Sequence, residues 1–210
     1  MSFLFTSRSY NSQSKQTAVK ELLENTVPDR DFYILVISAI ILATCGILLD
    51  NIPVLIASMI VAPLAYPIIS MGLAIISRDK KLFLQAILML FASIALAIII
   101  GGLFSIFVKS YFAVADRVLI SFFPNVFFDI VIAVVSGIVA VYGLVRPKVG
   151  SALTGIGIAV SLMPPLVAVG IGLFEATNDL ALRGASIFLL NVFGILLGSI
   201  IMFNILKIKK

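Results

Sequence analysis

The sequence predicts an all-α integral membrane protein, in which six transmembrane helices form two inverted repeats of three helices each. The first observation is composition, because 61% of the 210 residues are hydrophobic and 12% are charged, about half the charged fraction of an ordinary soluble domain. The second is a set of six apolar runs, each close to the roughly 20 residues that span a bilayer. The third is a pattern of polar and helix-breaking residues that the two halves share.

The six apolar runs follow a polar start. Residues 1–30 are predicted as a cytoplasmic tail that anchors the topology and carries a short amphipathic helix at Thr17–Asn25. The runs lack the polar face of a helix in a soluble protein, which argues against a soluble core. The predicted membrane helices are Phe32–Leu49, Val54–Ile76, Leu82–Val108, Asn125–Val145, Leu153–Phe174 and Gly184–Leu206.

These helices divide the chain into two repeats. The first repeat covers residues 31–108, and the second covers residues 125–206. Residues 109–124 are predicted as a connector along the outer interface, because this segment is longer than the other loops and partly apolar. Residues 207–210 form a basic cytoplasmic end.

The basic residues orient the chain. With the N-terminus in the cytoplasm, twelve of the 15 lysines and arginines fall inside, as the positive-inside rule requires. The net charge of +5 therefore follows topology and indicates no nucleic-acid partner. Six helices place both termini in the cytoplasm, and the expected location is the plasma (inner) membrane of a prokaryote. The outside basic residues are Lys109, Arg117 and Arg183, and the inside ones are Arg8, Lys15, Lys20, Arg30, Arg78, Lys80, Lys81, Arg146, Lys148, Lys207, Lys209 and Lys210.

Several classes of function are excluded by what the sequence lacks. Cys45 is the single cysteine, and there is no histidine, which removes disulfides within the chain, histidine proton relays and histidine metal sites. No Ser–His or Cys–His pair, P-loop or Rossmann glycine pattern is present. We therefore expect no enzyme activity, no metal and no cofactor. No signal peptide is expected, because the first apolar run lacks a small-residue cleavage site.

An offset of 98 residues aligns the two halves without a gap. Because each half holds three predicted helices, the second half enters the membrane from the opposite side, which is the plan of many secondary transporters. The match is weak at each residue, so a coincidence of composition is the alternative. The matching pairs are Asp31 with Asp129, Ser38 with Ser136, Pro67 with Pro165, and Gly72 with Gly170.

Each half interrupts one apolar run with prolines: IVAPLAYPII at Ile60–Ile69 and SLMPP at Ser161–Pro165. Proline removes a backbone donor and disturbs the preceding turn. Irregular backbone at membrane depth is tolerated where it is buried in protein or lines a watery cavity. The paired breaks therefore predict a substrate or ion site, and simple kinks are the alternative. Freed amides would suit an anion, and freed carbonyls a cation. The candidate residues here are Ala62, Pro63, Tyr66, Pro67, Ser161, Pro164 and Pro165.

Three further polar residues are candidates for the same site. Asp129 is the single acid clearly inside a predicted helix, which suggests a proton or cation carrier, although a carboxylate near a helix start also suits the helix dipole. Asn191 and Ser93 coincide at the offset and could bind substrate or satisfy backbone groups freed by the breaks. Tyr66 could close the site as a gate or serve in packing. The glycines expected to allow close helix packing are Gly72, Gly155, Gly157, Gly170 and Gly172.

Two motifs carry a resemblance to a known family. Residues Ser58–Leu64 read SMIVAPL, and residues Ala159–Pro165 read AVSLMPP. They are similar to the alanine–methionine–x–x–alanine–proline–leucine and alanine–valine–x–leucine–x–proline–proline stretches of the uncharacterised hydrophobic domain family of bacteria and archaea, a domain-of-unknown-function family. Ser58 stands where the family usually has alanine. The resemblance covers residues 30–206 and implies a six-helix membrane domain without an established substrate.

Two functions fit these observations. The first is a small secondary transporter or channel-like permease for a small solute or ion, with its site where the second and fifth helices cross near the midplane. The second is a membrane scaffold or sensor that acts through partner proteins or lipids, for which the crossing would be dry and tightly packed. The expected partners are the bilayer, the small solute or ion and, through glycine-rich faces, further copies of the chain.

Overall fold

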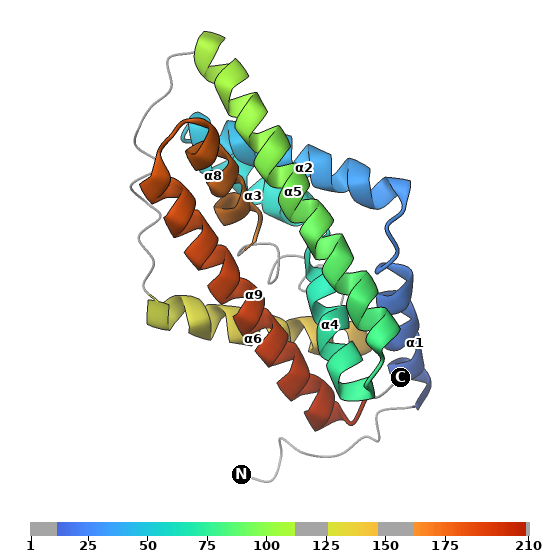
Figure 1. The fold of residues 1–210 in the computed structure, drawn as a ribbon. Coiled ribbons are helices and arrows are strands. Elements are labelled where there is room, and N and C mark those ends of the chain that lie inside the picture. The colour runs from blue at the N-terminus through green and yellow to red at the C-terminus, as the bar shows by residue number, and fades with distance from the viewer. Residues whose placement is uncertain (1–11, 112–125, 147–161, 209–210) are drawn as a thin grey trace.

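The computed structural model describes residues 12–111, 126–146 and 162–208, and the regular structure in these ranges is entirely helical (Figure 1). The helices follow one another with short turns, except across the ranges left out. They are α1 (Ser12–Glu24), α2 (Arg30–Leu48), α3 (Ile52–Val61), α4 (Ala65–Ser77), α5 (Lys80–Tyr111), α6 (Val126–Val145), α8 (Met163–Phe174) and α9 (Asn178–Leu206).

Four of these helices, α2, α5, α6 and α9, are long and apolar enough to cross a membrane. The predicted second span is present as two helices, α3 and α4, which bend by 44° at a short break and could together form a fifth crossing. The predicted fifth span is described only as α8, an apolar helix of 12 residues, because residues 147–161 lie outside the described ranges. The described chain thus has four to five candidate spans, which indicate a multi-pass membrane protein.

Short polar side chains begin three of the helices. Asp29 accepts a hydrogen bond from the N–H of Phe32 at 2.8 Å at the start of α2. Asn51 accepts from the N–H of Val54 at 3.2 Å at the start of α3. Asp79 accepts from the N–H of Leu82 at 3.0 Å at the start of α5. Each cap satisfies an amide that has no partner within its helix, so these residues fix where the apolar helices begin.

The two longest helices, α5 and α9, frame the molecule, and α4 and α8 each pack against both of them. Figure 1 shows that α4 and α8 begin near the middle of the molecule and run toward opposite ends. Helix α2 packs against α3, α5 and α8, and α6 packs chiefly against α9. The core is apolar, and its largest fully buried side chains include Leu64, Ile68, Leu73, Met163 and Leu166.

The outer faces of the long helices are apolar as well. On α5, Leu84, Leu88 and Phe91 recur at helical spacing and are each more than half exposed. On α9, Leu189 and Phe193 are exposed to a similar degree. Because large apolar patches are rare on soluble monomers, this surface suits contact with lipid chains.

Helix α1 is longer than the amphipathic stretch predicted at Thr17–Asn25, and it is packed onto the bundle. Ala18 and Leu22 on one of its faces are buried in the core, and the helix contacts α4 and α6. The Lys15 ammonium donates a hydrogen bond of 2.6 Å to the carbonyl oxygen of Leu206, at the end of α9. The N-terminal helix therefore joins the membrane helices at one end of the molecule.

Candidate functional site

The first break lies between α3 and α4. The last N–H of the α3 ladder, on Ala62, donates to the carbonyl oxygen of Ser58 at 3.1 Å, and the backbone of Ala62 then turns extended, with ψ 120°. Extended geometry is what a residue before proline prefers, and Pro63 has no N–H to continue the ladder. The helical path resumes at Ala65. Pro63 therefore causes the break that the sequence predicts.

Pro67 has a different role from the one that its sequence position suggests. It is the third residue of α4, and amides in a first turn have no partner within the helix. A proline there removes nothing that the helix uses. The pair of prolines does not break one helix twice; Pro63 ends the first helix, and Pro67 lies in the first turn of the next.

Helix α8, at the second proline motif, also begins with prolines in its first turn. Pro164 and Pro165 occupy the first turn of α8, and the N–H of Leu166 reaches the carbonyl oxygen of Leu162 at 3.4 Å. Every described residue from Leu162 to Gly172 is buried. Ser161 lies outside the described residues, as do Gly155, Gly157 and the rest of the segment that would correspond to α3.

The two helix starts have related electrostatics. Each carries the partial positive charge of a helix N-terminus. The prolines remove amide donors from both first turns, one in α4 and two in α8. The pair of starts can therefore attract negative charge through the dipoles but offers few N–H groups for direct binding.

Three other candidate residues, Ser93, Asn191 and Tyr66, are at least partly buried. Ser93 is fully buried, and its hydroxyl donates to the carbonyl oxygen of Met89 in its own helix at 2.9 Å, so this hydrogen bond does not brace a break. Asn191, its counterpart on α9, is buried at 5% exposure. Tyr66 is partly buried and close enough to Glu21 of α1 for the two groups to interact electrostatically.

Asp129 is not brought to the breaks. It lies in the first turn of α6, and Figure 1 places this end of α6 at the edge of the molecule, away from the starts of α4 and α8. A carboxylate is stabilised at that end of a helix by the dipole. Its Oδ2 atom is buried without a hydrogen bond from another described residue. This position agrees with the alternative interpretation, in which the Asp129 carboxylate stabilises the start of its helix.

Gly72 and Gly170 follow Pro67 and Pro165 at the same spacing, and both lie in close helix contacts. The sequence predicted such packing only in general terms. A Cβ added to Gly72 on α4 would collide with the Ser199 hydroxyl on α9. A Cβ added to Gly170 on α8 would lie 2.7 Å from the carbonyl oxygen of Ile98 on α5. Gly72 thus allows α4 to approach α9, and Gly170 allows α8 to approach α5. Gly172 likewise packs closely, against Ala181.

Acidic and thiol ligands are not clustered in the described chain. No group of three or more histidine, cysteine, aspartate or glutamate residues there could hold a metal ion. The described part of the candidate site consists of two helix starts and the buried apolar side chains around them.

The family model described as Domain of unknown function (DUF389) matches residues 59–197, which include both proline motifs. The chain belongs to this family. The resemblance noted in SMIVAPL and AVSLMPP is thereby confirmed. In this DUF389 protein the first motif includes the end of α3 and the second includes the start of α8.

One curated relative is the Uncharacterized protein MJ0678 of Methanocaldococcus jannaschii, which is 29% identical over 91% of this chain and 61% of its own length. The chain therefore spans about three fifths of the curated relative that it matches. No solved structure matches the chain.

Proposed function

We propose that this DUF389 protein is a small secondary transporter or permease for a small solute or ion, with its binding site between the proline-led starts of α4 and α8. The observation that carries the proposal is the pair of helix starts near the middle of the molecule, which lead in opposite directions (Figure 1). Discontinuous helices whose ends meet inside an inverted repeat are a frequent design for such sites.

Helix boundaries support the inverted repeat. Helices α4 and α8 begin at Ala65 and Met163, and α5 and α9 begin at Lys80 and Asn178. Both pairs of boundaries are 98 residues apart, the offset at which the sequence aligns with itself. In the proposed topology the fifth of six crossings is Leu153–Phe174, of which α8 is the described part, and both termini face the cytoplasm of a prokaryotic cell.

The reciprocal glycine contacts support a site between the repeats. Gly72 and Gly170 occupy equivalent positions, and each rests against the long helix of the other repeat. Rocking one repeat against the other would move the starts of α4 and α8 relative to these contacts. This is how alternating access around a fixed central site operates in transporters of this plan.

A cysteine-accessibility experiment tests the proposal, since Cys45 is the single native cysteine. In a Cys45→Ala background, single cysteines replace Ala62 and Ala65 at the first break. Ala168, a fully buried residue inside α8, supplies the matched control. We expect a charged, water-soluble maleimide to label Ala62→Cys and Ala65→Cys in membranes and to spare Ala168→Cys, because the thiolate reacts only where water reaches it.

Substrate protection identifies the ligand in the same assay. Small ions, amino acids, sugars and organic anions are screened for slower labelling of Ala65→Cys and for a rise in melting temperature, because a bound ligand stabilises the native state. Equal and negligible labelling at all three positions, with no protecting ligand, would contradict transport through this site.

The alternative is a membrane scaffold or sensor, and one observation favours it. All described residues from Leu162 to Gly172 are buried, as a dry and tightly packed crossing requires. A carrier in a closed state would look the same, so the labelling experiment separates the two. Self-association of the chain is proposed with either function. The interior contacts of Gly72 and Gly170 mean that it would use the exposed apolar faces instead.

A further inference from the structure

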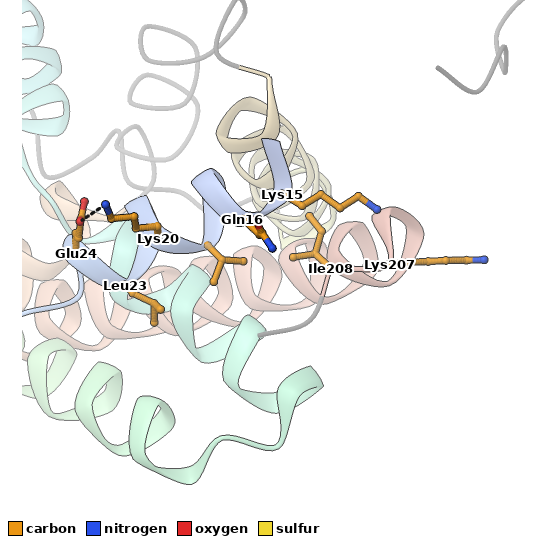
Figure 2. A pocket seen from close by; sticks show the side chains of 8 residues that line it. Lys15, Gln16, Lys20, Leu23, Glu24, Lys207 and Ile208 are labelled. Carbon is orange, nitrogen blue, oxygen red and sulfur yellow. Dashed lines mark ion pairs between the residues drawn. The ribbon is translucent and has the colours of Figure 1, made fainter. Parts of the chain in front are cut away.

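A groove of about 400 Å³ opens at the end of the molecule where α1 meets the C-terminal end of α9. One wall is a face of α1, with side chains at helical spacing, and the other is the short segment that follows α9 (Figure 2). The residues that line the groove are Lys15, Gln16, Val19, Lys20, Leu23, Glu24, Lys207 and Ile208.

The charges of the groove are predominantly positive. Three lysines line it against one glutamate, and that glutamate, Glu24, forms an exposed ion pair with Lys20. Figure 2 shows Lys15 and Lys207 extending side by side at one end, with Lys20 and Glu24 at the other. The sequence adds Lys209 and Lys210 directly after the lining residues.

The last carbonyls of α9 have partners, and one of these partners is the ammonium of Lys15. The Leu206 carbonyl oxygen accepts from the Lys15 ammonium at 2.6 Å. The carbonyl oxygens of Phe203 and Asn204 accept from the backbone amides of Ile208 and Lys207. These bonds also hold both walls of the groove in place.

Between the lysines the groove is apolar. Val19 and Leu23 of α1 are partly buried against the core, and Ile208 is 2% exposed. A phosphate ion would use the lysines and leave these side chains without a partner. A phospholipid presents both chemistries at once, since its phosphate lies next to the glycerol and the first methylenes of its acyl chains.

The position of the groove suits a lipid. Helix α9 is long and apolar enough to cross a bilayer, so its C-terminal end lies near a membrane surface. The N-terminal end of α5, with Lys80 and Lys81, lies toward the same end of the molecule (Figure 1). An anionic leaflet attracts such clustered basic side chains.

We propose that this groove is a binding site for an anionic phospholipid, whose phosphate contacts the lysines at one end of the groove and whose glycerol and first methylenes cover the exposed parts of Val19 and Leu23. The site lies on the surface, apart from the proline breaks. It does not depend on transport, so either result can hold without the other.

The test uses the purified full chain, stripped of native lipid in detergent. Native mass spectrometry measures binding of dioleoyl phosphatidylglycerol and of dioleoyl phosphatidylcholine, which has the same chains and no net charge. The variant is Lys20→Gln/Lys207→Gln, and the control is Lys80→Gln/Lys81→Gln, because all four lysines are exposed and only the first two line the groove. Lys15 is left intact because it also caps α9.

We expect phosphatidylglycerol to bind more tightly than phosphatidylcholine. The groove variant should weaken this binding at least about fivefold, the contribution of one lysine near the phosphate, whereas the control should weaken it less than twofold. Melting temperatures without lipid should be the same in all three proteins.

Equal affinity for the two lipids, or equal losses in the two variants, would overturn the proposal. Displacement of the lipid by inorganic phosphate alone would assign the groove to a free anion and overturn it too. The last contrary result would be that neither lipid binds the full chain and that both bind after residues 1–11 are deleted. The N-terminal segment, and not a lipid, would then occupy the groove.

Discussion

Lys109, near the end of α5, and Glu175, which follows α8, form an ion pair that ties the end of α5 to the end of α8. The Glu175 side chain is only 10% exposed, whereas that of Lys109 is 36% exposed. Attraction between opposite charges grows as water is excluded. This contact should therefore be worth more than an ion pair on the surface.

We expect Lys109→Met to lower the free energy of unfolding by about 2 kcal/mol, between the values for exposed and fully buried pairs. The loss arises because the Glu175 carboxylate stays largely buried without its cation. The measurement is unfolding in detergent, followed by loss of helical circular dichroism. The control, Lys20→Met, breaks the exposed pair with Glu24 and should cost less than about 0.5 kcal/mol. Equal losses in the two variants would contradict the buried role of Glu175.

Gly72 and Ser199 provide a second test, of the contact between α4 and α9. In Gly72→Ala the new methyl group would meet the Ser199 hydroxyl, and we expect a loss of about 1–3 kcal/mol from overpacking. Ser199→Ala in the same chain should recover part of this loss, because it removes the colliding hydroxyl and leaves the Cβ at a tight 3.3 Å, which a shift of a few tenths of an ångström relieves. The double-mutant cycle therefore has a large coupling energy.

Gly101→Ala is the matched control for this cycle. Its new Cβ would lie 3.3 Å from the end of the Val167 side chain and farther from Thr44. Those side chains can shift, and alanine is favoured over glycine inside a helix by about 1 kcal/mol. We expect Gly101→Ala to be neutral or slightly stabilising. Additive effects of Gly72→Ala and Ser199→Ala would show that the two helices do not meet at these residues.

A third prediction concerns the polar cluster formed by Thr26, Ser70 and Gln85, which follows the end of α1. The Thr26 hydroxyl donates to the Leu22 carbonyl oxygen at 2.7 Å and lies 2.5 Å from the Ser70 hydroxyl on α4. Since the Thr26 proton is used, Ser70 is the donor between the two hydroxyls. Gln85 on α5 donates to the Thr26 carbonyl oxygen at 2.7 Å. One residue thus links the turn after α1 to two membrane helices.

We expect Thr26→Val to cost about 1–3 kcal/mol, because it leaves a buried hydroxyl without its acceptor. Thr26→Val combined with Ser70→Ala should cost less than the sum of the single changes, since the unpaired hydroxyl is then removed as well. Unfolding in detergent measures both. Additivity would mean that the two hydroxyls do not interact in solution.

Much of the helical framework could be predicted from sequence. The apolar runs locate α2, α5 and α6 to within a few residues, because a membrane helix must be long and continuously apolar. The start of α9 was placed too late, at Gly184, because its first turns are polar and only the structure shows them to be helical from Asn178. The polar ends of a span follow helix capping and packing, which hydropathy does not measure.

The candidate site could be predicted only in outline. The sequence located the break at Pro63, yet it treated Pro63 and Pro67 alike, because the register of the new helix decides which proline the helix tolerates. It also gave Asp129 a place near the site, which the fold does not provide. The basic groove could not be foreseen at all, because Lys15 and Leu206 are 191 residues apart in the chain. Such contacts depend on how the two ends of the chain meet.

The difference between Pro63 and Pro67 yields the last prediction. Pro67→Ala changes a first-turn residue and should alter stability by less than about 1 kcal/mol. Pro63→Ala restores an amide at the break and allows α3 to continue toward α4, which reduces the bend of 44°. We therefore expect Pro63→Ala to decrease maleimide labelling of Ala65→Cys at least severalfold and Pro67→Ala to leave it unchanged. Labelling and unfolding in detergent check both variants. If the two substitutions change the labelling equally, the break is shared by both prolines, as the sequence alone suggested, and the role assigned to Pro63 is wrong.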